Sequence, residues 1–366
     1  MKNLSRRSFI AGTGAAAVMA GLLTACGKTQ GSADAPTAEG SAKSIYVLTP
    51  SEDHGWTGSV ATFAKAKIAD VNATATYKAE LQTADSAAKQ ISELEDILAG
   101  NKEHIAGIVI QPMDDTVQSA IQSVVDANIP YVAFDRIIDA VAPAAVSNVK
   151  GDNAGIGAGC ASYFVAHGLK PKDKVYVFEG DTSSVTTLRN QGFVDYLCGK
   201  LAFDGAKIDE SLKWTEDDLA SITYSGAMNW SRSDTKTAFE SLMGDAANTD
   251  IKWFYAEDDE LAMGIIEALE GGGIADSSKE SFLAHKPYIT GCGGLDELYE
   301  ILRGNTHREM LAQLGGLMSV TYSPSMIQLA IQDLVDHLDN KTVVQDHVIT
   351  CQNVTADNVA EFESFK

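Results

Sequence analysis

Two charged residues directly follow an apolar run in the middle of the chain. The run Tyr131-Val132-Ala133-Phe134 ends at Asp135 and Arg136. This pattern is typical of a buried parallel strand whose C-terminal end opens into a polar crevice. A carboxylate accepts hydrogen bonds from neighbouring hydroxyls and a guanidinium donates in a fixed plane, so the pair suits a neutral, hydroxyl-rich ligand. The alternative is a surface ion pair, which contributes about 0–1 kcal/mol to stability.

Short β-rich segments alternate with longer helical ones from Lys43 onward, as α/β domains with parallel sheets require. In the first half of this pattern we expect strands at 44–48, 73–81, 105–110 and 131–134, and helices at 60–71, 86–98 and 116–127. Parallel strands direct their C-terminal ends to one crevice. Asp135 and Arg136 therefore lie at the edge where a ligand would bind.

The same alternation returns in the second half of the chain. We expect strands at 174–178, 252–256 and 288–290, helices at 155–167, from about 188, at 233–243, 261–269 and 295–302, and a loop or insertion at 203–224. The two halves share no sequence identity and no period of about 20–50 residues. They predict two similarly folded lobes rather than a solenoid.

The N-terminus resembles the export signal of a bacterial lipoprotein. Residues 1–25 contain the basic pair Arg6 and Arg7, an apolar stretch too short for a spanning helix of about 20 residues, and small residues before Cys26. We expect Cys26 to be lipidated and 26–43, rich in small residues, to be a flexible tether. The paired arginines resemble a twin-arginine signal, with an ordinary secretory signal as the alternative.

The composition is strongly acidic. The 366 residues include 28 Lys and Arg and 50 Asp and Glu, for a net charge of −22. This charge argues against nucleic acid and against direct adhesion to anionic lipid, so membrane attachment would depend on Cys26. The other cysteines, which lack metal-binding spacing, are Cys160, Cys198, Cys292 and Cys351. We expect buried thiols, with a disulfide among them as the alternative.

Several short segments, taken in order, resemble a known family. They are Ser51-Glu52-Asp53-His54-Gly55-Trp56, Phe134-Asp135-Arg136, Glu179-Gly180, Leu188-Arg189-Asn190-Gln191-Gly192-Phe193, Tyr255-Ala256-Glu257-Asp258-Asp259-Glu260 and Thr321-Tyr322-Ser323-Pro324-Ser325-Met326. Together they resemble the periplasmic sugar-binding proteins of ABC transporters, of the ribose and galactose type, and most closely the members that bind galactofuranose. The resemblance extends from about Ile45 nearly to the C-terminus.

This resemblance implies an α/β fold of two Rossmann-like lobes with parallel sheets, joined by three crossing strands near 147–148, 322–323 and 346–347. The N-terminal lobe would comprise 44–148 plus 324–345, and the C-terminal lobe 149–322 plus 347–366. Hinge closure would enclose a monosaccharide between them. The implied partners are an ABC permease and its ATPase, and the implied protein is a monomer without a cofactor, a metal or enzymatic activity.

The resemblance also places the ligand contacts. Asp135 and Arg136 match the family's ligand pair, and Arg189 matches an arginine that reaches back to the sugar. The full expected set is Asp53, His54, Trp56, Asp135, Arg136, Asn153, Arg189, Asp258 and Tyr322.

Some of these residues have simpler alternative roles. Trp56 could stack on a sugar face or pack its loop against the lobe. Asp53 and His54 could be ordinary polar residues of an exposed loop, and Asn153 a helix N-cap. Asp258 stands where relatives carry an asparagine, and Asp259 resembles a structural acid at a helix start.

One departure from the family affects specificity. Relatives carry an acid in a Gly-x-Asp-Gly turn, but this chain reads Thr290-Gly291-Cys292-Gly293-Gly294-Leu295-Asp296, with Gly293 in the place of the acid. Asp296 lies one helical turn too deep and is expected to cap a helix. Either a second acid has moved to Asp258, or the ligand carries different groups.

Other functions fit the sequence less well. No GxSxG, HExxH or P-loop motif is present, and a glycosidase pair would need an acid with a raised pKa beside a water-accessible bond. A calcium site in 257–260 lacks the alternating spacing of a calcium loop. Asn229 and Arg232 lie near a family segment of the cleft rim but suit capping or surface roles. A sugar or autoinducer receptor for signalling, with the same fold, remains the alternative to transport.

Overall fold

The computed structural model describes residues 42–52 and 55–366. The predicted signal 1–25, the lipidation site Cys26, most of the predicted tether, and the loop residues Asp53 and His54 lie outside the described residues. Among the described residues, no helix is both long enough and apolar enough to cross a membrane.

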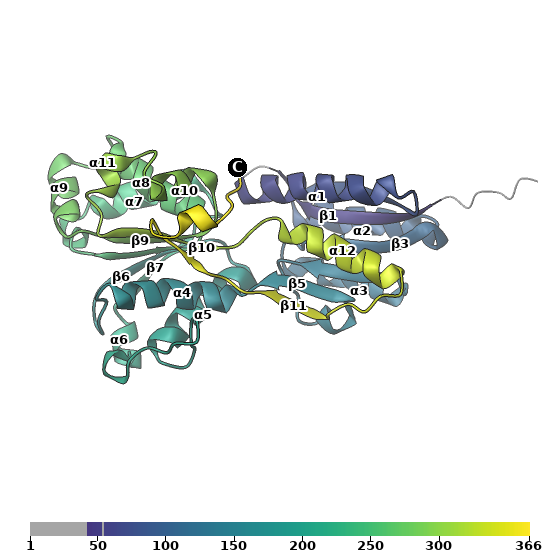
Figure 1. Cartoon of the computed structure of the whole chain (residues 1–366), viewed down its shortest axis with the longest axis horizontal. Coiled ribbons are helices and arrows are strands. Elements are labelled where there is room, and N and C mark those ends of the chain that lie inside the picture. Colours follow the sequence, from purple (N-terminus) through teal and green to yellow (C-terminus); the bar gives the residue numbers. More distant parts are fainter. Residues whose placement is uncertain (1–41, 53–54) are drawn as a thin grey trace, which may run out of the picture. The chain divides into compact units, whose positions relative to one another are not determined.

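The first lobe contains a sheet of six strands that all pair in parallel (Figure 1). In spatial order they are β11 (Asp346–Ile349), β5 (Ser147–Gly151), β4 (Tyr131–Phe134), β3 (Ile105–Ile110), β1 (Lys43–Pro50) and β2 (Tyr77–Ala84). The helices of this lobe are α1 (Gly55–Ala73), α2 (Ala87–Ala99), α3 (Gln118–Asp126) and α12 (Met326–Leu338).

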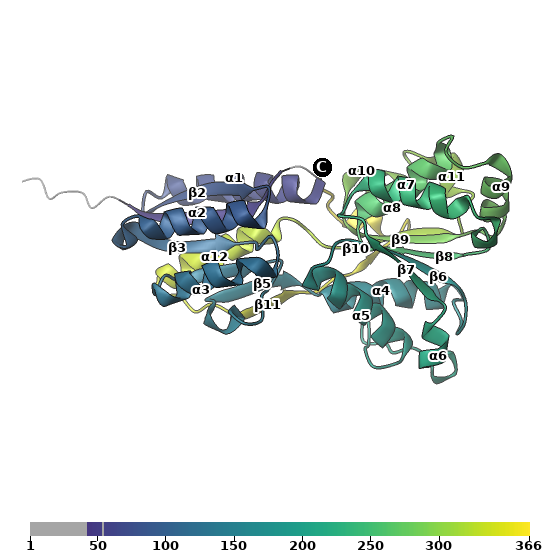
Figure 2. The same cartoon turned by 180° about the vertical axis from the view of Figure 1, so that it is seen from behind.

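Side-chain alternation along the central strands explains why helices cover both faces. Strands β3 and β4 are buried at every position. Ile108 and Tyr131 pack with α2 and α3, whereas Val109 and Val132 pack with α1 and α12 (Figures 1 and 2). Because successive side chains point to opposite faces, a continuous apolar run indicates a parallel strand covered on both sides.

The second lobe repeats this architecture. Its sheet runs in the order β12 (Asn353–Val354), β10 (Gly316–Thr321), β9 (Tyr288–Gly293), β8 (Trp253–Ala256), β6 (Val175–Glu179) and β7 (Ile222–Ala227). Only β12 pairs antiparallel in this sheet. Its main helices are α4 (Asn153–Ala166), α5 (Ser184–Leu197), α7 (Arg232–Met243), α8 (Asp259–Glu270), α9 (Asp276–Ala284) and α10 (Asp296–Leu302). Figure 1 shows α4 and α5 on one side of the sheet and α7, α8 and α10 on the other.

The chain passes three times between the lobes, after β5, after β10 and after β11, so the predicted fold class is confirmed. The first and third crossings lie further along than expected. The parallel ladder continues to the pair Ile349↔Gly151, so the backbone keeps its sheet partners beyond residues 148 and 347.

Other differences from the predicted elements have local causes. Helix α5 begins at Ser184, not near 188, because the Ser183 side chain caps it by accepting from the Val185 N–H. Strand β2 begins at Tyr77 because α1 continues to Ala73. The expected loop 203–224 includes the start of β7, and β10 and α9 were not predicted. All four cysteines in the described part of the chain are free thiols.

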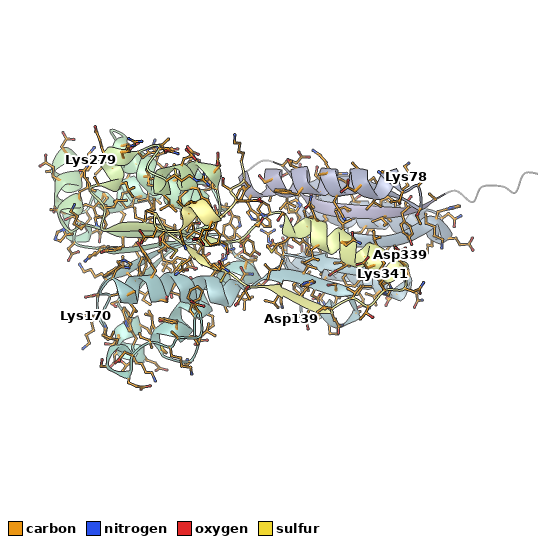
Figure 3. All side chains as sticks on the ribbon, in the orientation of Figure 1. Lys78, Asp139, Lys170, Lys279, Asp339 and Lys341 are labelled. Carbon is orange, nitrogen blue, oxygen red and sulfur yellow. The ribbon has the colours of Figure 1, made fainter. Side chains whose placement is uncertain are left out.

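Charged side chains are mostly at the surface. Lys78 and Lys170, labelled in Figure 3, are exposed and point away from the sheets. Some charged residues near strand ends are buried instead: Asp135, Arg189, Glu257 and Asp259. Burying a charge is costly unless it is paired or hydrogen-bonded, so the surroundings of these four residues indicate where function lies.

Candidate functional site

The Asp135 carboxylate accepts hydrogen bonds from two other parts of the chain. It follows β4 in a left-handed backbone conformation, with φ of 63°. Its Oδ2 accepts from Nε2 of Gln111 at 2.8 Å, and its Oδ1 accepts from the Tyr322 hydroxyl. Gln111 follows β3, and Tyr322 lies on the crossing after β10. The carboxylate is therefore fixed at the C-terminal edge of the first sheet.

Arg136 does not pair with its neighbour Asp135. Its Nη1 donates to the Met113 carbonyl at 2.8 Å, and its Nη2 donates to Oδ2 of Asp181 in the second lobe at 2.9 Å. Burial acts to raise the pKa of Asp181, but the Arg136 guanidinium and donors from Ser183 and Trp230 outweigh it and lower the pKa. Arg136 is thus a contact between the lobes as well as a wall of the site.

Trp56 is held by the protein at both its ring and its N–H. The indole stacks on Phe134 with ring centroids 6.1 Å apart, and its Nε1 donates to the Tyr322 carbonyl at 2.8 Å. The N–H therefore already has a protein partner. What Trp56 can offer a ligand is ring surface.

Arg189 is the central cation of the second lobe and is only 2% exposed. Its Nε donates to Oδ1 of Asn153 at 3.0 Å, and its Nη1 donates to the Glu257 carbonyl. The guanidinium lies over the rings of Tyr322 and Trp230, 4.8 and 5.3 Å from their centroids. Burial alone would lower the pKa of Arg189, but the nearby Cys292, Tyr322, Tyr255 and Glu257 raise it. Aromatic faces and carbonyl oxygens thus fix its position.

Asp258 and Asp259, two of the four consecutive acids after β8, have different hydrogen-bond partners. Asp258 caps α8 by accepting from the Glu260 N–H at 2.7 Å, and burial followed by its neighbour Asp259 raises the pKa of Asp258 to about 8. Asp259 accepts from the N–H groups of Gly294 and Leu295 at 2.7 and 2.9 Å, and burial raises its pKa to about 6. Asp259 therefore ties the β9 turn to α8, the structural role we expected.

The backbone conformation at Gly293 disfavours the acid that relatives carry at this position. It adopts φ of 143°, and a Cβ there would meet Oδ2 of Asp259 at 3.4 Å and the Phe365 ring at 3.5 Å. Asp296 does not replace the acid, because its side chain accepts from the Ser364 hydroxyl at 2.6 Å. The acid that the second lobe presents to the site is Asp258.

These residues surround a cavity of about 380 Å³. It is lined by Trp56, Thr57, Gln111, Asp135, Arg136, Val185, Arg189, Trp230, Asp258 and Tyr322. This volume includes space that is open to solvent. Both lobes contribute to its walls.

Six of the residues predicted from the sequence meet in this cavity: Trp56, Asp135, Arg136, Arg189, Asp258 and Tyr322. Asn153 does not line it but orients Arg189 from behind. Arg232 points elsewhere and pairs with Glu260 at 2.6 Å and Glu297 at 2.7 Å.

Four lining residues were missed: Thr57, Gln111, Val185 and Trp230. For Gln111 the signal was available, because it ends the apolar run 105–110 as Asp135 ends 131–134. Trp230 gave no periodic signal, because it and Asn229 adopt isolated left-handed conformations, with φ of 57° and 53°.

Two polar atoms at the cavity lack hydrogen-bond partners among the described residues. They are Oε1 of Gln111, an acceptor, and Nε of Arg136, a donor, and both are buried. A buried polar group without a partner costs about 1–3 kcal/mol. Both atoms belong to residues that line the cavity.

Two parallel α/β lobes, three crossings and a polar cavity at the strand ends define a two-lobe binding protein. The sequence matches the periplasmic binding protein domain over residues 45–342, and the chain belongs to this family. The family consists of solute-binding proteins rather than enzymes.

A curated relative and two solved structures illustrate the similarity. The chain is 23% identical over 266 residues to the fructose import binding protein FruE of Bifidobacterium longum, covering 71% of this chain and 70% of that protein. A galactofuranose-binding protein superposes with a TM-score of 0.66 at 18% identity, covering 87% of this chain and 96% of the other. An ABC transporter solute-binding protein from Bacillus halodurans, with bound myo-inositol, gives 0.67 at 19%, covering 89% and 98%.

Proposed function

We propose that this protein is the extracytoplasmic binding component of an ABC importer and that its ligand is a monosaccharide, a hexose or pentose in pyranose or furanose form. The observation that carries the proposal is the group formed by Gln111, Asp135 and Arg136. All three residues line one small cavity, and among the described residues Oε1 of Gln111, an acceptor, and Nε of Arg136, a donor, are buried without a hydrogen-bond partner. The names of the similar proteins support a sugar or a cyclic polyol as the ligand class.

Binding would involve hinge closure and no covalent step. A ring with adjacent hydroxyls would lie against the Trp56 indole, donate to Oε1 of Gln111 and accept from Nε of Arg136. Asp258, with its raised pKa, can donate or accept from the second lobe. Each misplaced hydroxyl would leave a buried polar atom unpaired, at about 1–3 kcal/mol, so the site would discriminate between epimers.

The cellular arrangement is also part of the proposal. A lipid on Cys26 would anchor the monomer to the outer face of the bacterial cell membrane, with 26–43 as its tether. The closed form would then deliver the sugar to the permease and its ATPase. Mass spectrometry of the protein extracted from membranes would test the anchor, because a Cys26→Ala variant should lack the lipid mass.

A thermal-shift screen tests the ligand class. Purified protein is heated with D-fructose, D-galactose, L-arabinose, D-ribose or myo-inositol, and with amino acids as negative probes. A ligand that binds only the folded state stabilises it and so raises the melting temperature. At a ligand concentration of 100 times Kd the free energy of unfolding increases by about 2.7 kcal/mol. We expect at least one ring compound to raise the melting temperature. No shift with any ring compound, or a shift with amino acids alone, would contradict the proposal.

A further inference from the structure

Asp181 connects two walls of the cavity without lining it. Its Oδ2 accepts from Nη2 of Arg136 and from Nε1 of Trp230, each at 2.9 Å. Its Oδ1 accepts from the backbone N–H of Ser183 at 2.9 Å and from the Ser183 hydroxyl at 2.5 Å. Both carboxylate oxygens are used, and one of the four donors comes from the other lobe.

A polar groove lies on the other side of these contacts. Its volume is about 860 Å³, and it is lined by Glu179, Asp181, Thr182, Thr186, Thr187, Asn190, Gln191, Val194, Tyr224, Gly226 and Ala227. Arg136 and Trp230 line the cavity, whereas Asp181 lines the groove. The first turn of α5 is shared between the two spaces in the same way, because Val185 lines the cavity and Thr186 lines the groove. The three bonded side chains therefore form a partition between the two spaces.

The partition is built into the second lobe. Trp230 has φ of 57°, an unusual conformation for a bulky residue, and its ring packs where Gly180 has no side chain. A Cβ at position 180 would overlap the ring. A strained backbone persists where its surroundings over-determine it, and such strain is concentrated at functional sites. Here the packing against Gly180 and the hydrogen bond from the indole N–H to Asp181 hold Trp230 in this conformation.

The groove has the chemistry to hold another hydroxyl-bearing ring. Its lining is mostly hydroxyl, amide and carboxylate side chains. Oδ1 of Asn190 is buried there without a hydrogen-bond partner among the described residues, and Glu179 accepts from Nδ2 of Asn190 at 2.8 Å. A second ring that reached the groove would find acceptors, so the partition rather than the groove excludes it.

We propose that Asp181 is a specificity-determining residue that limits the ligand to one ring. By holding Arg136 and Trp230 together, it closes the cavity against the groove, so a free monosaccharide fits and the same ring with a substituent on its anomeric oxygen does not. This inference rests on the proposed function. Asp181 touches no ligand in this role; it positions the two residues that do.

The test compares each free ring with a glycoside of that ring. Calorimetry is run with D-fructose and sucrose, and with D-galactose and its two methyl glycosides, methyl β-D-galactopyranoside and methyl β-D-galactofuranoside. The proteins are the unaltered chain, Asp181→Ala, Asp181→Asn and a control, Asp250→Ala. Asp250 forms an exposed ion pair with Lys174 at 2.8 Å and touches neither space. All variants are checked for cooperative thermal unfolding first.

We expect the unaltered protein to bind a free ring at least about 100-fold more tightly than its glycoside, within the range that steric discrimination achieves. In Asp181→Ala that ratio should fall by about tenfold or more, with Asp181→Asn in between and Asp250→Ala unchanged. An unchanged ratio in Asp181→Ala, or tight glycoside binding by the unaltered protein, overturns the role of Asp181 while leaving monosaccharide binding intact. Failure of every ring and glycoside to bind overturns the proposed function as well. If Asp181→Ala fails to fold, the ratio in Asp181→Asn decides.

Discussion

The two lobes reach the cavity through the same topology but with different electrostatics. In the first lobe, Asp135 receives two side-chain donors at the strand ends, from Gln111 and Tyr322. In the second lobe, four consecutive acids follow β8, and burial raises the pKa of the first three, Glu257, Asp258 and Asp259. Arg189 is the cation buried among them. The comparison shows that the end of a parallel strand determines where a polar side chain lies. The groups around that side chain then determine its pKa.

The largest effect is expected from Arg189→Ala. This substitution leaves Oδ1 of Asn153 and the Glu257 carbonyl without their donor and removes the cation from a buried acidic group. Breaking such a network costs about 3–5 kcal/mol, so we expect a large loss of stability in urea unfolding.

Arg232→Ala is the matched control for this variant. Arg232 pairs with three glutamates but is partly exposed, so its loss should cost about 1 kcal/mol or less. Equal losses for the two variants would contradict the central role assigned to Arg189 in the second lobe.

Asp135→Ala should have the largest effect on binding that leaves the fold intact. The substitution removes the acceptor of Gln111 and Tyr322 at the cavity wall, and an unpaired buried group costs about 1–3 kcal/mol. We expect affinity for the sugar identified by thermal shift to fall by about 10- to 100-fold in calorimetry. The melting temperature should fall less than in Arg189→Ala. Affinity within twofold of the unaltered protein would remove Asp135 from the site.

Gly293→Asp tests whether the turn after β9 could supply a ligand acid. The new side chain would face Asp259 and Phe365 rather than the cavity, in a backbone conformation that suits glycine. We expect a loss of about 1–3 kcal/mol in stability and no tighter binding. Tighter sugar binding by this variant would show that the turn after β9 can supply the ligand acid after all.

The smallest effect should be a pH dependence that originates in the second lobe. The pKa is raised from 3.8 to about 8 for Asp258 and from 4.5 to about 7 for Glu257. From about pH 4 upward, the folded protein keeps protons that the unfolded chain has lost, so its stability should fall as pH rises to about 8. We expect a decline of roughly 1 kcal/mol or more between pH 5 and 8 in urea unfolding, and a shallower decline in Asp258→Asn. Identical slopes would show that Asp258 does not hold the proton.

The sequence predicted those parts of the site that obey a periodic rule. Asp135 and Arg136 could be placed because a strand buried on both faces must end where charge begins. The family motifs predicted Arg189 and Tyr322 as ligand contacts, and both line the cavity. Asp181 and Trp230 could not be found in this way, because they depend on a loop with left-handed residues and on a contact between lobes. The extension of β5 and β11 was missed for a related reason, since strand pairing depends on a partner about 200 residues away.

Tyr322 gives the molecule a property that neither lobe has alone. Its hydroxyl contacts Asp135, its carbonyl contacts Trp56 and its ring covers Arg189, yet it lies on a segment that joins the lobes. A change in the torsion angles of that linker must shift the wall of the binding chamber. If the lobes close on a ligand as proposed, filling the chamber and turning one half against the other would be thermodynamically coupled, and a substitution in the linker would alter both equilibria together.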